Sequence, residues 1–149
     1  MDRDNHAGKL STKGWIIGFF DGEGYIGLWK RTDHRVGYKD TYRPSVVIAN
    51  TDEKTINYLS EQLKEFGVPS YIKSRPGKGN WRPYWTVEIN GFERLKKFIA
   101  FIGNDSVTKK EQVLLVKEFI DRRSLGDKNV PYIAREHEIY EKLKLLKRA

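Results

Sequence analysis

A stripe of glycines near the N-terminus constrains this chain more than any other feature of its sequence. Residues 11–24 read Ser-Thr-Lys-Gly-Trp-Ile-Ile-Gly-Phe-Phe-Asp-Gly-Glu-Gly, and Gly14, Gly18 and Gly22 recur every four residues. That spacing places the three glycines on one face of a helix. Each glycine destabilises a helix by about 1 kcal/mol relative to alanine, so the stripe requires a compensating contact. Close packing of a second helix against the bare face would supply it.

The other residues of this segment predict a helix that ends at two acidic side chains. Apolar residues recur at helical spacing, at Trp15, Ile16, Phe19 and Phe20. Ser11 or Thr12 is expected to cap the helix by accepting a hydrogen bond from a free backbone N–H. Asp21 and Glu23 fall at the other end, where unpaired carbonyls carry partial negative charge. An acid is unfavourable there unless a cation accompanies it. We therefore interpret this helix end as a metal site; a solvated helix end is the alternative.

The same residues resemble a known motif. Residues 16–24, Ile-Ile-Gly-Phe-Phe-Asp-Gly-Glu-Gly, resemble the nine-residue sequence that names the LAGLIDADG homing endonucleases. Gly18, Asp21 and Gly24 match letters of the motif. Glu23 stands where the family most often has aspartate and where glutamate is an accepted variant. The order of elements that follows extends the resemblance over nearly the whole chain.

Composition limits the class of protein and the kind of metal site. The chain has 149 residues, which predicts one domain (1–149), and its 38% hydrophobic content is sufficient for a core. No membrane span or signal peptide is recognisable, so we expect an intracellular, cytoplasmic protein with no membrane partner. Without cysteine, a metal must bind oxygen or imidazole ligands, and carboxylates favour hard ions such as Mg²⁺. The net charge of +8 favours a polyanionic partner, although 20 acidic residues also fit a merely solubilising surface.

The remainder of the chain predicts two pairs of strands, each followed by helical segments. Residues 1–10 are expected to form a loose lead-in, and residues 127–149 a linker and a final helix. The predicted strands are 25–31, 42–49, 70–75 and 81–89, with Pro44 marking an edge or bulge and a turn at 76–80. The predicted helices carry apolar stripes of Ile56, Leu59, Leu63 and Phe66; Phe92, Leu95, Phe98, Ile99 and Ile102; Val113, Leu114, Val116 and Ile120; and Ile139, Leu143 and Leu146. Gly67 and Gly103 end the first two, and Thr108–Glu111 resembles a capping box for the third.

This order predicts an α+β fold in which a four-stranded antiparallel sheet has helices packed on one face. The LAGLIDADG homing endonucleases have this order of elements, and the resemblance implies that the open sheet face lies on DNA. The chain contains a single copy of the motif helix. A glycine stripe with no partner helix inside the chain implies a homodimer. The expected dimer interface is formed by Gly14, Gly18, Asp21 and Gly22.

The resemblance also implies roles for the residues around the helix end. It makes Glu23 the catalytic, metal-binding acid and the Gly22 carbonyl a further metal ligand, whereas Asp21 has a structural role. Two-fold symmetry would bring the two Glu23 side chains close together. Asn50 is either a helix N-cap or the counterpart of a family glutamine that organises water near the scissile phosphate. The family's active-site lysine corresponds to Lys109, with Lys110 as the alternative, because the register is not fixed by the sequence.

Basic and aromatic residues on the strands predict a nucleic-acid surface. From Lys73 to Val87 there are four basic residues and no acidic one, and alternation places Lys73 and Arg75 on one face. Arginine suits guanine because its two-pronged guanidinium can bond O6 and N7 together. The predicted DNA-binding residues are Trp29, Arg31, Arg35, Lys39, Arg43, Ser45, Val47, Lys73, Arg75, Lys78, Arg82 and Trp85. Solvated charge is the alternative for the loop residues Arg35 and Lys39.

These observations lead to one functional hypothesis and one rival. The chain is expected to be a homodimeric endonuclease that hydrolyses both strands of a long, pseudopalindromic DNA site with Mg²⁺ or Mn²⁺, whereas Ca²⁺ would bind without supporting cleavage. No small-molecule cofactor is expected. The rival is a LAGLIDADG protein that does not cleave, either an RNA-splicing maturase or a DNA-binding regulator. It would keep the basic sheet but need no acid.

Overall fold

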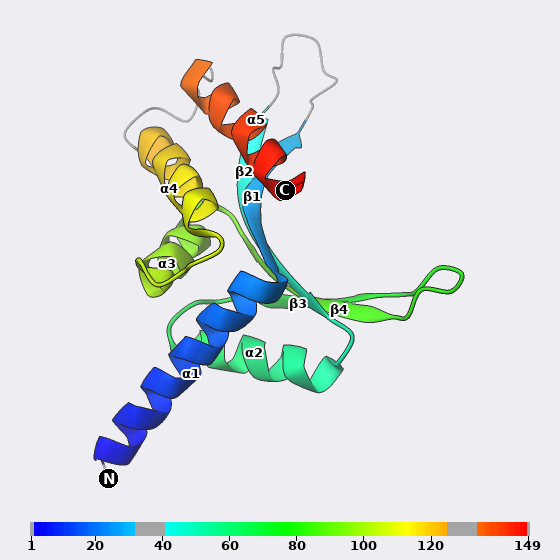
Figure 1. Ribbon diagram of the computed structural model, residues 1–149, viewed down its shortest axis with the longest axis vertical. Helices are drawn as coiled ribbons and strands as arrows, with labels where there is room; N and C mark the ends of the chain where they lie inside the picture. Colours follow the sequence, from blue (N-terminus) through cyan, green and yellow to red (C-terminus); the bar gives the residue numbers. More distant parts are fainter. Residues whose placement is uncertain (1, 32–40, 125–133, 149) are drawn as a thin grey trace.

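The computed structural model describes residues 2–31, 41–124 and 134–148. The helices and the two pairs of strands follow one another in the predicted order, and one sheet crosses the molecule with the helices beside it (Figure 1). The helices are α1 (Asp2–Glu23), α2 (Glu53–Glu65), α3 (Phe92–Ile102), α4 (Lys110–Ser124) and α5 (Ala134–Arg148). The strands are β1 (Gly24–Arg31), β2 (Thr41–Asn50), β3 (Tyr71–Arg75) and β4 (Tyr84–Asn90). None of the helices described is both long and apolar enough to cross a membrane.

All four strands belong to one antiparallel sheet with the order β1-β2-β4-β3. This confirms the predicted α+β class and its four-stranded antiparallel sheet. Pro44 pairs with Leu28 of β1, and the β4 ladder begins one residue later at Ser45. The proline therefore lies where β2 is locally an edge, as its missing N–H group requires. The β3–β4 hairpin extends away from the helices (Figure 1).

Side-chain alternation divides the sheet into two faces. Ile26, Val46 and Val87 mark what we call the covered face, because they are buried against the helices. α2 contributes Ile56, Leu59 and Leu63 to this core, and α3 contributes Leu95, Phe98, Ile99, Phe101 and Ile102. Gly67 and Gly103 follow the ends of these two helices with positive φ angles, as predicted. The opposite side, which we call the open face, carries Tyr25, Gly27, Trp29, Arg31, Arg43, Ser45, Val47, Tyr71, Lys73, Arg75, Thr86, Glu88 and Asn90.

α1 is longer than the sequence predicts. It begins at Asp2, so the expected loose lead-in over residues 1–10 is wrong for the described residues. The expected N-cap is also wrong, because the Thr12 hydroxyl donates to the Gly8 carbonyl 2.8 Å away within the helix. No proline interrupts residues 2–13, and extending an existing helix costs much less than starting one. The helix can therefore continue beyond the part that packs on the core.

Two expectations for α4 require correction. Leu114 is exposed, whereas Leu115 and Phe119 join Val113, Val116 and Ile120 in the core. The Thr108 hydroxyl donates to the Asp21 carbonyl of α1 at 2.9 Å, so the predicted capping box gives way to a contact between α1 and the turn that precedes α4. In α5, Ile139 and Leu143 are buried and Leu146 packs against the core, as predicted. The expected linker from residue 127 to the start of α5 lies outside the described residues.

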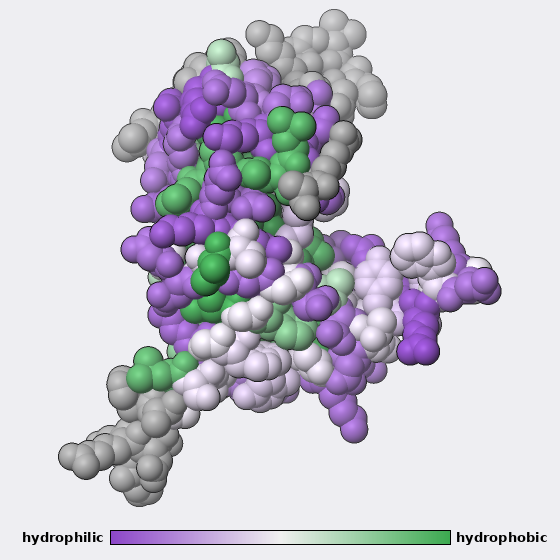
Figure 2. Space-filling view, in the orientation of Figure 1, coloured by the Kyte–Doolittle hydropathy of each residue, from purple (hydrophilic) through white to green (hydrophobic). Residues whose placement is uncertain are grey.

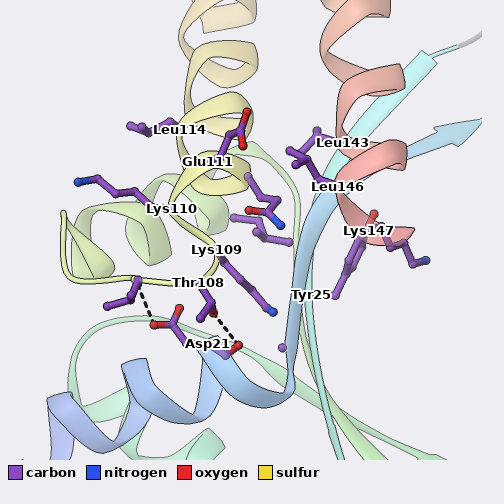
Figure 3. A pocket seen from close by; sticks show the side chains of 14 residues that line it. Asp21, Tyr25, Thr108, Lys109, Lys110, Glu111, Leu114, Leu143, Leu146 and Lys147 are labelled. Carbon is purple, nitrogen blue, oxygen red and sulfur yellow. Dashed lines mark hydrogen bonds between the residues drawn. The ribbon is translucent and has the colours of Figure 1, made fainter. Parts of the chain in front are cut away.

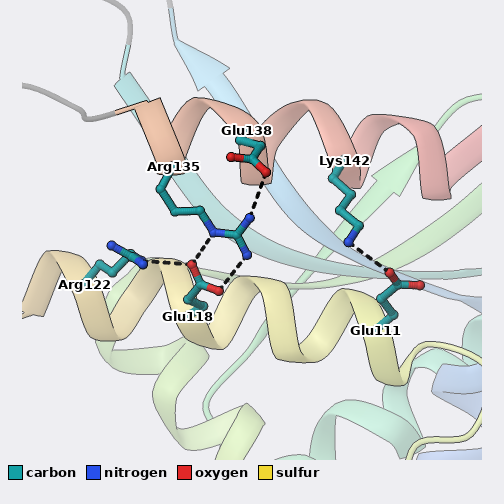
Figure 4. A network of polar contacts seen from close by, with 6 residues as sticks. All are labelled: Glu111, Glu118, Arg122, Arg135, Glu138 and Lys142. Atoms are coloured by element: carbon teal, nitrogen blue, oxygen red, sulfur yellow. Dashed lines mark hydrogen bonds and ion pairs between the residues drawn. The ribbon is translucent and has the colours of Figure 1, made fainter.

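Ion pairs connect the facing surfaces of α4 and α5 (Figure 4). Arg135 donates from Nε and Nη2 to the two carboxylate oxygens of Glu118, at 2.7 and 2.8 Å. Arg122 and Glu138 extend this network, and Lys142 pairs separately with Glu111 at 3.5 Å. The hydrogen bonds from Arg135 are the main reason that the pKa of Glu118 falls to about 2. The pairs hold α5 beside α4, where its Leu146 and Lys147 reach β1 and the end of α1.

Candidate functional site

The end of α1 passes directly into β1 at a glycine. A Cβ atom on Gly24 would lie 2.6 Å from Cδ1 of Phe20 and 2.7 Å from the Phe20 carbonyl oxygen. A larger residue would push the strand away from the helix, so glycine is required for this close approach. In the sheet Gly24 pairs with Ile48 of β2. The helix end is therefore fixed at the end of β2, near Asn50.

The two acids at this helix end have different surroundings. The Asp21 carboxylate accepts hydrogen bonds from Ser106 Oγ at 2.5 Å and from the Val107 N–H at 2.8 Å. Asp21 thus ties α1 to the segment that leads into α4, which agrees with a structural role. Glu23 is exposed, and among the described residues it has no hydrogen-bond or ion-pair partner. The neighbouring Gly22 is exposed as well.

The glycine stripe has no partner within the part of the chain that the structure describes. A Cβ atom built on Gly14, Gly18 or Gly22 would meet nothing within 4 Å, and all three residues are exposed. Figure 2 shows pale, near-neutral residues along α1. Trp15 is not a core residue: it is 38% exposed, stacks on Phe19 with ring centroids 5.2 Å apart, and meets Tyr58 edge-on at the same distance. Of the four residues predicted to form the dimer interface, Gly14, Gly18 and Gly22 meet no described residue, whereas the Asp21 carboxylate is already held by Ser106 and Val107.

A pocket of about 890 Å³ lies beside the helix end, between α1, β1, α4 and α5. Both candidate lysines line it, but Lys109 is half-buried and points toward β1, whereas Lys110 is exposed and points away (Figure 3). α5 adds Lys147, whose Nζ lies 4.6 Å from the centre of the Tyr25 ring. The orientation favours Lys109 over Lys110 as the cation that reaches a ligand at this site.

Asn50 lies half-buried at the end of β2. Its side-chain oxygen accepts a hydrogen bond from the Asp52 N–H at 2.7 Å. The N-cap position of α2 belongs to Asp52, so the expected N-cap role of Asn50 is wrong by two residues. The side-chain carbonyl of Asn50 stabilises the turn into α2, and the side-chain NH₂ group has no partner among the described residues.

The open face is basic and partly aromatic. Trp29 is 54% exposed and pairs across the sheet with Arg43. Lys73 and Arg75 of β3 lie on the same face, with side chains about half exposed. Arg31 is exposed at the end of β1. These five predicted DNA-binding residues therefore share one accessible surface.

Other members of the predicted DNA-binding set are placed differently. Trp85 is wrong for the open face: it pairs with Ser74 and packs against the core, because its position in β4 has the parity of Val87. Ser45 is buried and donates to Asn90 Oδ1 at 2.6 Å, so its hydroxyl is used inside the protein. Val47 is half-buried, and Lys78 and Arg82 are exposed around the hairpin turn. Arg35 and Lys39 lie outside the described residues.

Sequence reasoning missed Glu88, a buried acid on the open face. It is 6% exposed and accepts hydrogen bonds from Thr86 Oγ1 at 2.7 Å and Arg75 Nη2 at 3.0 Å. Lys73 Nζ lies 3.7 Å from the same carboxylate. Burial alone would raise the pKa of Glu88, but the bonds from Thr86 and Arg75 and the charge of Lys73 outweigh it, so the pKa is lowered. Strand alternation is the sequence signal that could have revealed it, because Glu88 lies on the same face of β4 as Thr86 and pairs with Tyr71.

Among the described residues, no three His, Cys, Asp or Glu side chains gather closely enough to hold a metal ion. At the helix end, the Glu23 carboxylate is the one without a partner among the described residues. Carboxylate and carbonyl oxygens suit Mg²⁺ and Ca²⁺, so the type of donor fits the expected ion. A complete ligand set would need a second copy of the chain or the oxygens of a substrate.

Comparison with known proteins agrees with this arrangement. The family model of the LAGLIDADG-like domain matches residues 12–103. The archaeal intron-encoded homing endonuclease I-Vdi141I, solved in complex with DNA, has a TM-score of 0.63 at 18% identity over 90% of this chain and 97% of its own. I-CvuI, solved with a DNA target and Mg, gives 0.63 at 17% identity over 91% and 96%. The K262A mutant of I-SmaMI gives a TM-score of 0.64 at 20% identity over 89% of this chain but 43% of its own. No curated protein sequence matches the chain.

A motif helix that ends in acids beside an antiparallel sheet with one open basic face defines a class of nucleic-acid-directed proteins. The family match covers more than half of the chain, and it includes the glycine stripe and the whole sheet. The chain belongs to the LAGLIDADG homing endonuclease family.

Proposed function

We propose that this protein is a homodimeric, site-specific DNA endonuclease that cuts both strands of a pseudopalindromic target. The observation that carries the proposal is that three features at the same end of α1 are each suited to a partner or ligand that the described residues do not provide. These are a bare glycine stripe, an exposed Glu23 with no partner among the described residues, and a pocket lined by Lys109. A second copy packed on the stripe would bring two such ends together.

Each residue of this end has a defined task in the proposal. Glu23 and the Gly22 carbonyl would hold a divalent ion, Mg²⁺ or Mn²⁺ in the active enzyme. When bound, the ion neutralises charge on the phosphate and polarises water for hydrolysis. Asp21 keeps the helix end in place through Ser106 and Val107. Lys109 would stabilise negative charge on the phosphate, and the free NH₂ group of Asn50 would orient water.

The open face would bind the DNA. Its exposed cations, Arg31, Arg43, Lys73 and Arg75, belong to three strands, and Lys78 and Arg82 continue the charge to the hairpin turn. Phosphate contacts by such cations give affinity, whereas an arginine held in one orientation can read a base edge. DNA complexes of I-Vdi141I and I-CvuI support this assignment by analogy of fold.

The test is cleavage by a variant that lacks the proposed metal-binding charge. Glu23→Gln keeps the shape of the side chain and removes its charge, so cleavage with Mg²⁺ should be lost while binding to the same DNA is retained. Glu53→Gln is the matched control, because Glu53 is exposed at the start of α2 outside the site. Cleavage by Glu23→Gln at the wild-type rate would show that the active site lies elsewhere.

A maturase or regulator without nuclease activity is the rival. It would explain the open basic face but assigns no role to Glu23, which has no partner among the described residues. Incubation of the wild-type protein with its selected DNA target, with Mg²⁺ and then with a chelator, separates the two. Binding without cleavage in Mg²⁺ and in Mn²⁺ would favour the rival.

A further inference from the structure

Glu88 is the single acidic residue in the four strands, which also carry five basic residues, Lys30, Arg31, Arg43, Lys73 and Arg75. An acid in a surface that binds polyanions is unfavourable unless it has a separate task, because it repels phosphate. It is also buried, which costs free energy unless the charge is fully hydrogen-bonded. The surroundings of Glu88 meet that condition, so the acid is built into the face.

The carboxylate lies at the end of a chain of hydrogen bonds that crosses three strands. Ser45 of β2 donates to Asn90 of β4, Asn90 donates to the Tyr71 hydroxyl of β3, and Tyr71 donates to Glu88 Oε1 at 3.4 Å. The Thr86 hydroxyl donates to the other carboxylate oxygen, Oε2. Glu88 therefore has a single orientation before any ligand arrives.

Glu88 in turn restricts the orientation of the Arg75 side chain. Its Nη2 donates to Glu88 Oε2 at 3.0 Å, while 43% of the Arg75 side chain remains exposed. A guanidinium has five N–H donors, so this bond leaves the others for a ligand. A side chain that is already ordered loses less conformational entropy when it binds. Glu88 itself is too deeply buried to reach a base, which excludes direct readout by its own carboxylate.

We propose that Glu88 is a positioning residue for sequence readout, and that it acts by aiming the Arg75 guanidinium at a base edge of the bound DNA. The inference rests on the proposed DNA-binding function and deepens it. The negative charge of Glu88 also offsets part of the attraction of Lys73 and Arg75 for phosphate. Glu88 thus raises the ratio of specific to non-specific binding.

The experiment begins with a DNA target selected from a randomised library by the wild-type protein. Affinities are then measured for this target, for each single-base substitution in one half-site, and for random-sequence DNA. Glu88→Gln should reduce discrimination at one base position by about five- to tenfold, without weakening binding to random DNA. Thr86→Val, which removes only the hydroxyl that supports Glu88, should reduce discrimination at the same position by a smaller factor. The Thr86→Val variant also tests the inference if Glu88→Gln folds poorly.

Two controls separate positioning from a general structural effect. Glu93→Gln makes the same charge change at an exposed residue of α3 that pairs with Lys96, and it should leave discrimination unchanged. In an Arg75→Gln background, Glu88→Gln should have no further effect at that position. Wild-type discrimination in both Glu88→Gln and Thr86→Val, a parallel loss of affinity for all sequences, or a loss that persists without Arg75 would overturn this inference alone. Failure of the wild-type protein to select any sequence would overturn the proposed function as well.

Discussion

Asp21 and Glu23 are separated by one residue, yet their side chains have opposite surroundings. Residues two apart in a helix point in nearly opposite directions, at about 200° around its axis. Asp21 therefore meets the segment before α4, whereas Glu23 points to solvent. Lys109 and Lys110 also diverge although they are adjacent, since Lys109, in the turn before α4, points toward β1, and Lys110, the first residue of α4, points away (Figure 3).

The difference between the lysines gives a prediction at the residue scale. Lys109→Ala should lower the rate of DNA cleavage by roughly 10²-fold or more, because a positioned cation beside the reacting phosphate is lost. Lys110→Ala is the matched control and should cleave at nearly the wild-type rate. Single-turnover cleavage at saturating enzyme measures the chemical step without a contribution from binding. Equal losses in the two variants would contradict the assignment of Lys109.

At the scale of elements, α5 is held on α4 by a short polar network in addition to its apolar stripe. Glu118 and Arg135 form a two-pronged pair, and each has a further partner (Figure 4). This network places the end of α5 beside β1, where Leu146 and Lys147 close one side of the pocket. The stability of this contact therefore bears on the shape of the candidate site.

The lowered pKa of Glu118 predicts a pH dependence of this contact. Its pKa is about 2 in the folded protein and about 4.3 in an unfolded chain, so its contribution is complete above about pH 5. The contribution is lost as the pH falls from about 4.3 toward 2. Wild type should thus unfold a few degrees above Glu118→Gln at pH 7, and the difference should disappear near pH 2. Thermal unfolding followed by circular dichroism measures both.

Glu111→Gln is the control for that measurement, because both side chains of the Glu111–Lys142 pair are at least half exposed. Exposed pairs of this kind contribute little to stability, so the melting temperature of this variant should stay close to that of wild type at both pH values. A difference between wild type and Glu118→Gln that is as large at pH 2 as at pH 7 would show that charge is not the cause.

Local patterns in the sequence were sufficient for the elements but not for how they meet. Alternation and apolar stripes predicted every strand and helix, and the faces of Lys73 and Arg75 followed from parity. The register of β4 shows that Trp85 has the opposite parity and does not lie on that face. Thr12 and Thr108 were assigned as caps, but each hydroxyl bonds a carbonyl that the local sequence does not reveal.

The role of Glu88 required contacts between strands. It lies 13 residues from Arg75 in the chain, and the antiparallel register brings them together on one face. The segment counted for charged residues in the sequence ran from Lys73 to Val87 and therefore ended one residue before Glu88. Likewise, no sequence pattern distinguishes Lys109 from Lys110, because the choice depends on where α4 begins relative to β1.

For the whole molecule, the described chain forms a complete core but an incomplete site. Ile16, Ile17 and Phe20 bury one side of α1, while the glycine side meets nothing. Glu23, exposed and without a partner in the described part of the chain, lies at the end of the same helix. If a second chain packs on the glycines, the two-fold axis relates both glycine stripes and both Glu23 residues. Assembly and catalysis would then depend on one element.

Gly18→Leu tests this dependence directly. A leucine at the centre of the stripe would hold the two helices apart, so the variant should sediment as a monomer or aggregate and fail to cut its target. Gly8→Leu makes the same exchange in the same helix, about 80° around the axis from Gly18, and should remain an active dimer. Both exchanges raise helix propensity by nearly 1 kcal/mol, so loss of the dimer in Gly18→Leu alone cannot come from a weaker helix. Sedimentation equilibrium of the three proteins decides the matter. A wild-type monomer that cuts both strands, or an active Gly18→Leu dimer, would contradict assembly through the stripe.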